Sequence, residues 1–192
     1  MMKRIFIAAA KILLFMAGFV LALYMFIPWR EAGKFAVSAA QSILQQRGMR
    51  LNYSDVSRAE GGFTVDNLTL SGMVEISLGS VTVRPAFLSS ILSLAPVCDI
   101  TFRGGSVRLG QTMNFGDGGF LLTAGREVLL ENLRTNGDFS LNGYMTIDTS
   151  AMRIGHAEAR LDVPETFSQN MGVLRNLLPL VQEGDRWYLR RK

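Results

Sequence analysis

Three successive hydrophobic patterns divide the chain into stretches with different expected structures. Residues 5–27 are apolar except for Lys11, and no charged residue lies between Ile12 and Ile27. As an α-helix these 23 residues would be about 35 Å long, which exceeds the roughly 30 Å of a bilayer core. The pattern therefore predicts a transmembrane helix over residues 5–27, preceded by a short N-terminal segment of residues 1–4.

Basic residues on the N-terminal side of this segment predict its orientation. Lys3, Arg4 and Lys11 lie on that side, whereas basic and acidic residues nearly balance on the other. Because basic flanks stay in the cytoplasm, residues 1–4 are expected to be cytoplasmic. A signal peptide cleaved after Ala22 is the alternative. The uncleaved anchor is favoured, since no small-residue site follows the apolar run.

Residues 28–48 show the periodicity of an amphipathic helix, which would connect the membrane anchor to the rest of the chain. Apolar residues recur every three or four positions, and Gly48 stands where a helix commonly ends. The residues expected on the apolar face are Phe35, Ala36, Ala39, Ala40, Ile43 and Leu44.

Beyond Met49 the apolar positions recur every second residue, which is typical of β-strands. Residues 49–192 are therefore expected to form a mainly β domain outside the membrane. One side of the sheet would be apolar, either as a covered core or as a groove for an apolar ligand. The candidate residues for this apolar face are Phe63, Val65, Leu68, Leu70, Val74, Ile76, Val81, Val83, Phe139, Leu141, Met145 and Ile147.

Glycines between the alternating runs predict where strands turn or kink. Gly104-Gly105 is expected to turn a hairpin, and Gly116-Asp117-Gly118 to separate a strand over residues 112–115 from one over residues 119–123. The alternation changes phase near Asn67, which predicts a β-bulge there.

Two short helices interrupt the strands, one over residues 86–94 and one over residues 164–178. Strands joined by hairpins, with so few helices, indicate an antiparallel meander rather than βαβ units. The predicted fold is mainly β: an N-terminal transmembrane helix followed by a curved antiparallel sheet with a few packing helices. The helix over residues 164–178 would cover one face of the sheet.

Composition narrows the possible functions. Four of the 20 basic residues and none of the 16 acidic ones lie in residues 1–30, which leaves 16 of each sign in the remainder. A domain of balanced charge argues against nucleic-acid binding. Cys98 is the single cysteine, so no intrachain disulfide can form, and it is expected to be a buried strand residue.

Catalytic, cofactor and metal sites are not indicated by any motif. His156 is the single histidine, and no cysteine cluster accompanies it, so a zinc site is not expected. The glycine-rich stretch at residues 116–119 has neither the Lys-Ser/Thr of a phosphate-binding loop nor the spaced carboxylates of a calcium loop. We expect a protein without enzymatic activity and without a cofactor.

The order of these segments resembles the AsmA-like proteins and their relatives, type II secretion system protein N (GspN). After the membrane segment the resemblance lies in residues 45–48 (QQRG), 51–56 (LNYSDV), 62–70 (GFTVDNLTL), 81–85 (VTVRP) and 100–105 (ITFRGG). Near the C-terminus, residues 177–180 (LLPL) and 184–189 (GDRWYL) resemble the ending of the GspN-type group.

The resemblance implies a single-pass protein of the bacterial inner membrane with its β domain in the periplasm. A GspN-like protein would be a non-enzymatic accessory component of type II secretion, with other secretion-system subunits as partners. An AsmA-like protein would instead bind phospholipid or carry it between membranes along an apolar β groove. A cell-envelope hydrolase is a third hypothesis, which no motif supports.

Overall fold

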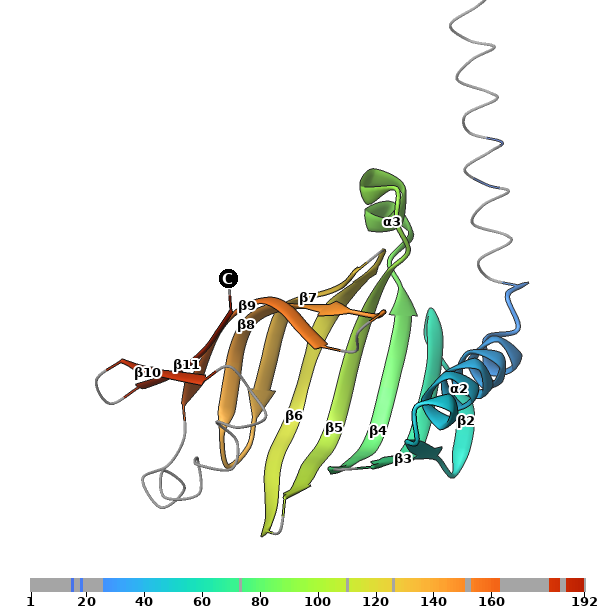
Figure 1. Ribbon diagram of the computed structural model, residues 1–192. Helices are drawn as coiled ribbons and strands as arrows, with labels where there is room; N and C mark the ends of the chain where they lie inside the picture. The colour runs from blue at the N-terminus through green and yellow to red at the C-terminus, as the bar shows by residue number, and fades with distance from the viewer. Residues whose placement is uncertain are drawn as a thin grey trace, which may run out of the picture.

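The computed structural model describes residues 15, 18, 26–72, 74–109, 111–125, 127–150, 153–162, 180–183 and 186–191. Over these residues eleven strands form one antiparallel sheet, accompanied by two helices, α2 (Trp29–Gln46) and α3 (Phe87–Ser93) (Figure 1). The prediction of a mainly β fold with a curved antiparallel sheet is confirmed.

Most strands follow one another across the sheet as a meander, in the order β1-β3-β4-β5-β6-β7-β8-β9-β11-β10. The short strands β1 and β2 both pair with β3, one after the other along the same edge. The strands are β1 (Arg50–Asn52), β2 (Asp55–Ala59), β3 (Gly62–Ser71), β4 (Glu75–Pro85), β5 (Val97–Leu109), β6 (Gln111–Ala124), β7 (Glu127–Asn136), β8 (Ser140–Asp148), β9 (Arg153–Asp162), β10 (Leu180–Glu183) and β11 (Arg186–Arg191).

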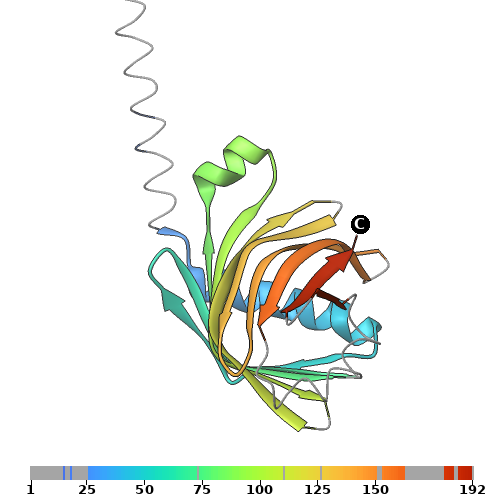
Figure 2. The same cartoon turned by 90° about the vertical axis from the view of Figure 1, so that its left-hand side faces the viewer.

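The sheet is strongly curved, and α2 lies on its concave side (Figure 2). This curvature brings the turn between β8 and β9 close to the end of α2. There Arg47 Nη2 lies 3.5 Å from the carbonyl oxygen of Ser150. The helix therefore spans the concave side from one end of the sheet toward the other.

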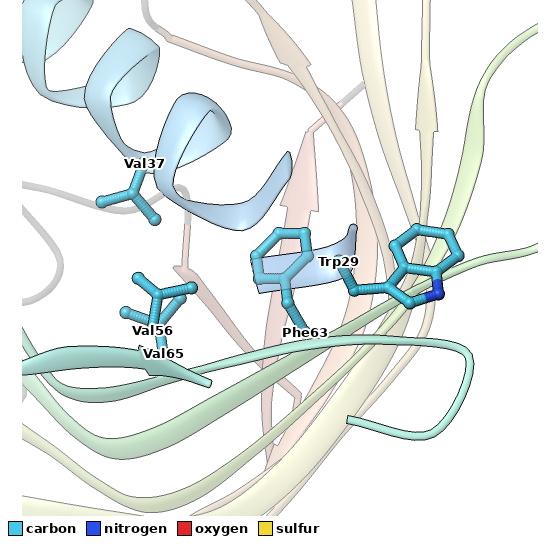
Figure 3. Packing of buried hydrophobic residues seen from close by; sticks show 5 residues of the cluster. All are labelled: Trp29, Val37, Val56, Phe63 and Val65. Carbon is cyan, nitrogen blue, oxygen red and sulfur yellow. The ribbon is translucent and has the colours of Figure 1, made fainter. Parts of the chain in front are cut away.

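The first hydrophobic core lies between α2 and the strands β2 and β3 (Figure 3). Trp29 and Val37 of the helix pack with Val56, Phe63 and Val65 of the strands, and all five side chains are buried. The helix approaches closely because residue 33 is glycine: a Cβ there would lie 2.7 Å from the Phe63 ring and from Val56 Cγ1. Helix α2 therefore packs closely against the end of the sheet formed by β2 and β3.

Helix α2 lies within the range of residues 28–48 predicted to be helical. Pro28 stands just before its first residue, where a missing N–H costs little. At the other end Gly48 adopts φ +74°, and the N–H groups of Gly48 and Met49 donate to the carbonyls of Gln45 and Leu44 at 3.0 Å. This is a Schellman motif, which favours glycine because of the left-handed backbone.

The face that α2 presents to the sheet differs from the predicted one. Trp29, Gly33 and Val37 are buried, whereas Phe35 is 78% exposed and Ile43 59% exposed. The four-residue spacing was predicted correctly, but the row that packs on the sheet contains Gly33 and not Phe35. Gly33 determines which row faces the sheet, because only the row that contains it lets the helix backbone approach Phe63.

Two predicted interruptions of the sheet are wrong. Residues 97–109 form the single strand β5 instead of a hairpin at Gly104-Gly105, and residues 111–124 form the single strand β6 instead of two strands. Gly104 and Gly116 have positive φ, and the pairing register of β5 with β6 shifts beside both. These glycines bend two long strands, as β-bulges do, without reversing the chain.

The phase change near Asn67 is present, but it is not a bulge with an extra residue. Asn67 adopts φ +49°. The register of β3 with β4 is the same on both sides of it, since Asp66 pairs with Ser80 and Leu68 with Leu78. The left-handed residue alone turns the following side chains, so that Leu68 packs with the same cluster as Phe63.

Two predicted helices lie largely outside the described residues. The predicted helix over residues 164–178 falls wholly outside them, and of residues 5–27 only Phe15, Gly18, Phe26 and Ile27 are described. No helix within the described ranges is long and apolar enough to cross a membrane. Strand β10, which follows residues 164–178, was not predicted from the sequence.

Candidate functional site

One face of the sheet is apolar across nearly all of its strands. In an antiparallel sheet, residues that pair directly point to the same face, so the register shows which side chains lie together. The rows of paired residues on this face are Phe63–Val83–Ile100–Phe120, Leu70–Ile76–Val107–Met113, Leu122–Leu130–Met145–Ala157 and Leu133–Gly143–Ala159–Leu189. We call this the apolar face; α2 packs on it.

The opposite face is polar along an equally continuous row. The hydroxyls of Thr64 and Thr82 lie 2.8 Å apart and hydrogen-bond across β3 and β4. Further pairing extends the row over eight strands: Thr64–Thr82–Thr101–Gly119–Arg134–Asn142–Arg160–Tyr188. The alternation read from the sequence therefore separates the two faces almost completely.

Of the twelve predicted apolar-face residues, ten lie in strands and share this face. They occupy β3, β4 and β8, and the pairing rows connect them through β5, β6 and β7. Val74 and Phe139 lie just before β4 and β8 instead of within them. Phe139 still reaches the apolar face, where its ring centroid lies 6.1 Å from that of Phe115.

Burial on the apolar face is uneven along the sheet. At one end α2 covers the cluster around Phe63 and Val65. At the other end, Ala157, Ala159, Leu161, Trp187 and Leu189 are buried on β9 and β11. Between them Phe102, Met113 and Leu133 are also buried. Other apolar side chains of the central strands are half-buried: Ile76, Val81, Ile100, Phe120, Leu122, Leu130, Met145 and Ile147.

A group of aromatic rings lies on the central part of this face. The Phe102 ring meets the Phe115 ring edge-on at 5.5 Å and lies 6.5 Å from the Phe120 ring. Room for Phe115 comes from Gly105, where a Cβ would lie 2.1 Å from the ring. The bend at Gly104-Gly105 therefore admits an aromatic side chain that a regular strand would exclude.

Side chains of α2 also occupy the edge of the sheet formed by β1 and β2. Arg30 Nε donates to the carbonyl of Val56 at 3.1 Å, and Gln41 Nε2 donates to the carbonyl of Leu51 at 2.8 Å. Unpaired edge carbonyls otherwise attract a further strand. Sequence reasoning missed these two residues, because a polar residue on an amphipathic helix gives no sign of the carbonyl it will meet.

The polar face has a shallow hollow of about 650 Å³ whose floor includes Gly118 and Gly119. Asp99, Asp117 and Arg134 are among the lining residues, so both signs of charge are present. Asp117 is already engaged, since its Oδ1 accepts a hydrogen bond from the Gly104 N–H at 2.9 Å. The predicted glycine-rich stretch thus forms a bent strand with an open surface beside it.

The two residues considered for chemistry lie in different surroundings. Cys98 is half-buried on β5, paired with Leu122, and burial raises the pKa of its thiol. His156 is exposed on β9, with its ring centroid 5.9 Å from that of Tyr144. Across the described ranges, no three His, Cys, Asp or Glu side chains come together as metal ligands.

Comparison with known proteins gives one family. A family model described as type II secretion system protein GspN-like, Synergistales, matches residues 6–191. No curated protein and no solved structure matches the chain. The match agrees with the GspN-like part of the resemblance seen in the sequence, and nothing in it supports the AsmA-like part.

Proposed function

The chain belongs to the GspN-like family of type II secretion system proteins, and on that premise we propose that it is a non-enzymatic accessory component of type II secretion. The match over residues 6–191 carries the proposal, because it includes the apolar N-terminal segment, α2 and the whole sheet. The protein would act by binding other subunits.

The proposed location is the inner membrane, with a single N-terminal anchor and the sheet in the periplasm. The apolar run of residues 5–27 and the basic residues before it support this orientation. The last two residues of that run, Phe26 and Ile27, lead through Pro28 directly into α2. Because α2 is packed on the sheet, the anchor would hold the sheet close to the membrane surface.

The polar face is the surface that we assign to partner subunits. Its row of threonine, asparagine and arginine side chains offers hydrogen-bond donors and acceptors over eight strands. The edge formed by β1 and β2 is a poorer docking surface, since Arg30 and Gln41 already donate to its carbonyls.

Deleting the gene in the host bacterium tests the proposed role. We expect the secretion of folded substrates to fall, and to recover when the full chain is restored. A matched strain would carry the chain with Arg134→Glu and Arg160→Glu on the polar face, which should restore secretion less well. Normal secretion in the deletion strain would refute the role.

A second candidate function is the binding of a lipid on the apolar face. The observation that favours it is the set of half-buried apolar side chains on the central strands of that face. Acyl chains would pack against side chains such as Phe120 and Leu130. Native mass spectrometry of the full chain released in mild detergent should then detect a phospholipid adduct, and its absence would count against lipid binding.

A further inference from the structure

The loop between β4 and β5 exposes several large apolar side chains to water, which is energetically unfavourable. Residues 85–98 contain no charged residue. Within them α3 and the residue after it present Leu88, Ile91, Leu92 and Leu94 to solvent, with Leu92 85% and Leu94 93% exposed. Among the loops whose residues the structure describes, this one carries the most exposed large apolar side chains. Clusters of this kind mark sites of contact with another apolar surface.

Two serine hydroxyls of this loop form local hydrogen bonds with its backbone. The Ser90 hydroxyl donates to the carbonyl of Ala86 at 2.9 Å and accepts the N–H of Val97 at 2.9 Å. The Ser93 hydroxyl donates to the carbonyl of Ser89 at 2.7 Å. Serine hydroxyls that bond back to the helix leave few groups that need water. A loop with satisfied polar groups and an apolar exterior is suited to a lipid environment.

The loop also emerges from the end of the sheet where α2 begins. Trp29, the first residue of α2, packs in the same cluster as Phe63. Phe63 pairs with Val83, which lies only four residues before the start of α3. Figures 1 and 2 both show the start of α2 and α3 toward the same end of the sheet.

We propose that α3 inserts into the surface of the lipid bilayer that holds the N-terminal segment, as a second point of attachment. This inference rests on the proposed membrane anchorage. A seven-residue helix is about 10 Å long, too short to cross a bilayer core of roughly 30 Å, so α3 would lie in the interface with its apolar side chains about 5–10 Å deep. With two attachments the sheet has a fixed orientation relative to the membrane, instead of rotating about a single anchor.

The test uses the full chain in lipid nanodiscs of phosphatidylethanolamine and phosphatidylglycerol. In a Cys98→Ala background, Leu92→Cys carries a nitrobenzoxadiazole dye, whose emission shifts to the blue in an apolar environment. Glu75→Cys is the matched control, because Glu75 is exposed at the opposite end of the same strand that leads to α3. We expect the Leu92 label alone to be blue-shifted and to be quenched by brominated lipid. Adding Leu88→Asp should reduce both effects.

The outcomes separate this inference from the anchorage. If the chain enters nanodiscs but the Leu92 label emits as in water, α3 does not insert, and the anchorage stands. A blue shift without quenching by brominated lipid would mean that protein covers α3, which also overturns the inference. A chain that does not enter nanodiscs at all refutes the anchorage, and the inference with it.

Discussion

Replacing Phe63 with alanine tests whether the contact between α2 and the sheet holds this end of the domain together. Phe63 is only 8% exposed and packs with Trp29 of the helix and Val65 of its own strand. Truncating a buried phenylalanine to alanine removes its transfer free energy and leaves a cavity, at a cost of about 3–5 kcal/mol.

The magnitude can be measured by urea or thermal unfolding of the full chain in detergent. For a chain of this size each kcal/mol shifts Tm by about 2–4 °C, so Tm should fall by roughly 6–20 °C. The two tryptophans report on different ends, because Trp29 packs in the α2 cluster and Trp187 in the cluster on β9 and β11. In a Trp187→Phe background, Trp29 fluorescence therefore follows the α2 end alone.

Leu88→Ala is the control, since a side chain that is 79% exposed should change the free energy of unfolding by less than about 0.5 kcal/mol. A loss of less than about 1 kcal/mol for Phe63→Ala would refute the reasoning. It would show that α2 is only loosely associated with the sheet, and that the core assigned to this end contributes little stability.

Three further predictions concern single sites. Gly33→Val should lower the free energy of unfolding by about 1–3 kcal/mol in urea titrations, because even a Cβ at this position would lie 2.7 Å from the Phe63 ring. Gln41→Ala should lower it by about 0.5–1.5 kcal/mol in the same assay, because the Leu51 carbonyl loses its donor. Cys98 should react with iodoacetamide at pH 8 more slowly in the folded chain than in urea, and faster as pH rises, because burial raises the pKa of its thiol.

Each of these predictions has a matched comparison. Ser38→Val and Gln45→Ala place the same new side chains at exposed positions of α2, and both should be nearly neutral. If Ser38→Val is as destabilising as Gly33→Val, the effect does not come from the close approach of Gly33 to Phe63. Equal alkylation rates of Cys98 in the folded and unfolded chain would contradict its half-buried position.

The two-residue alternation was sufficient to predict the antiparallel sheet and most of its apolar face. It worked because each strand has one face toward the core and one toward water. Residues such as Val65, Val81 and Met145 could be placed on one side before their partners were known. The helical period likewise predicted α2 within about two residues at each end.

The sequence did not predict which glycines turn the chain and which bend a strand. Gly104-Gly105 has the composition of a hairpin turn, yet the strand continues, since the pairing of β4 with β5 resumes beyond it. That outcome depends on partners in β4 that are distant in sequence. The packed row of α2 was missed for the same kind of reason, because Gly33 matters only when Phe63 lies opposite.

The central claim is that this GspN-like chain works as a subunit of the type II secretion apparatus. Purification of the intact, C-terminally tagged chain from native membranes, followed by quantitative mass spectrometry, tests it most directly. The account predicts that other secretion-system subunits are enriched well above an unrelated single-pass membrane protein purified in the same way. Recovery of the intact chain from membranes with no enriched secretion subunit would contradict it.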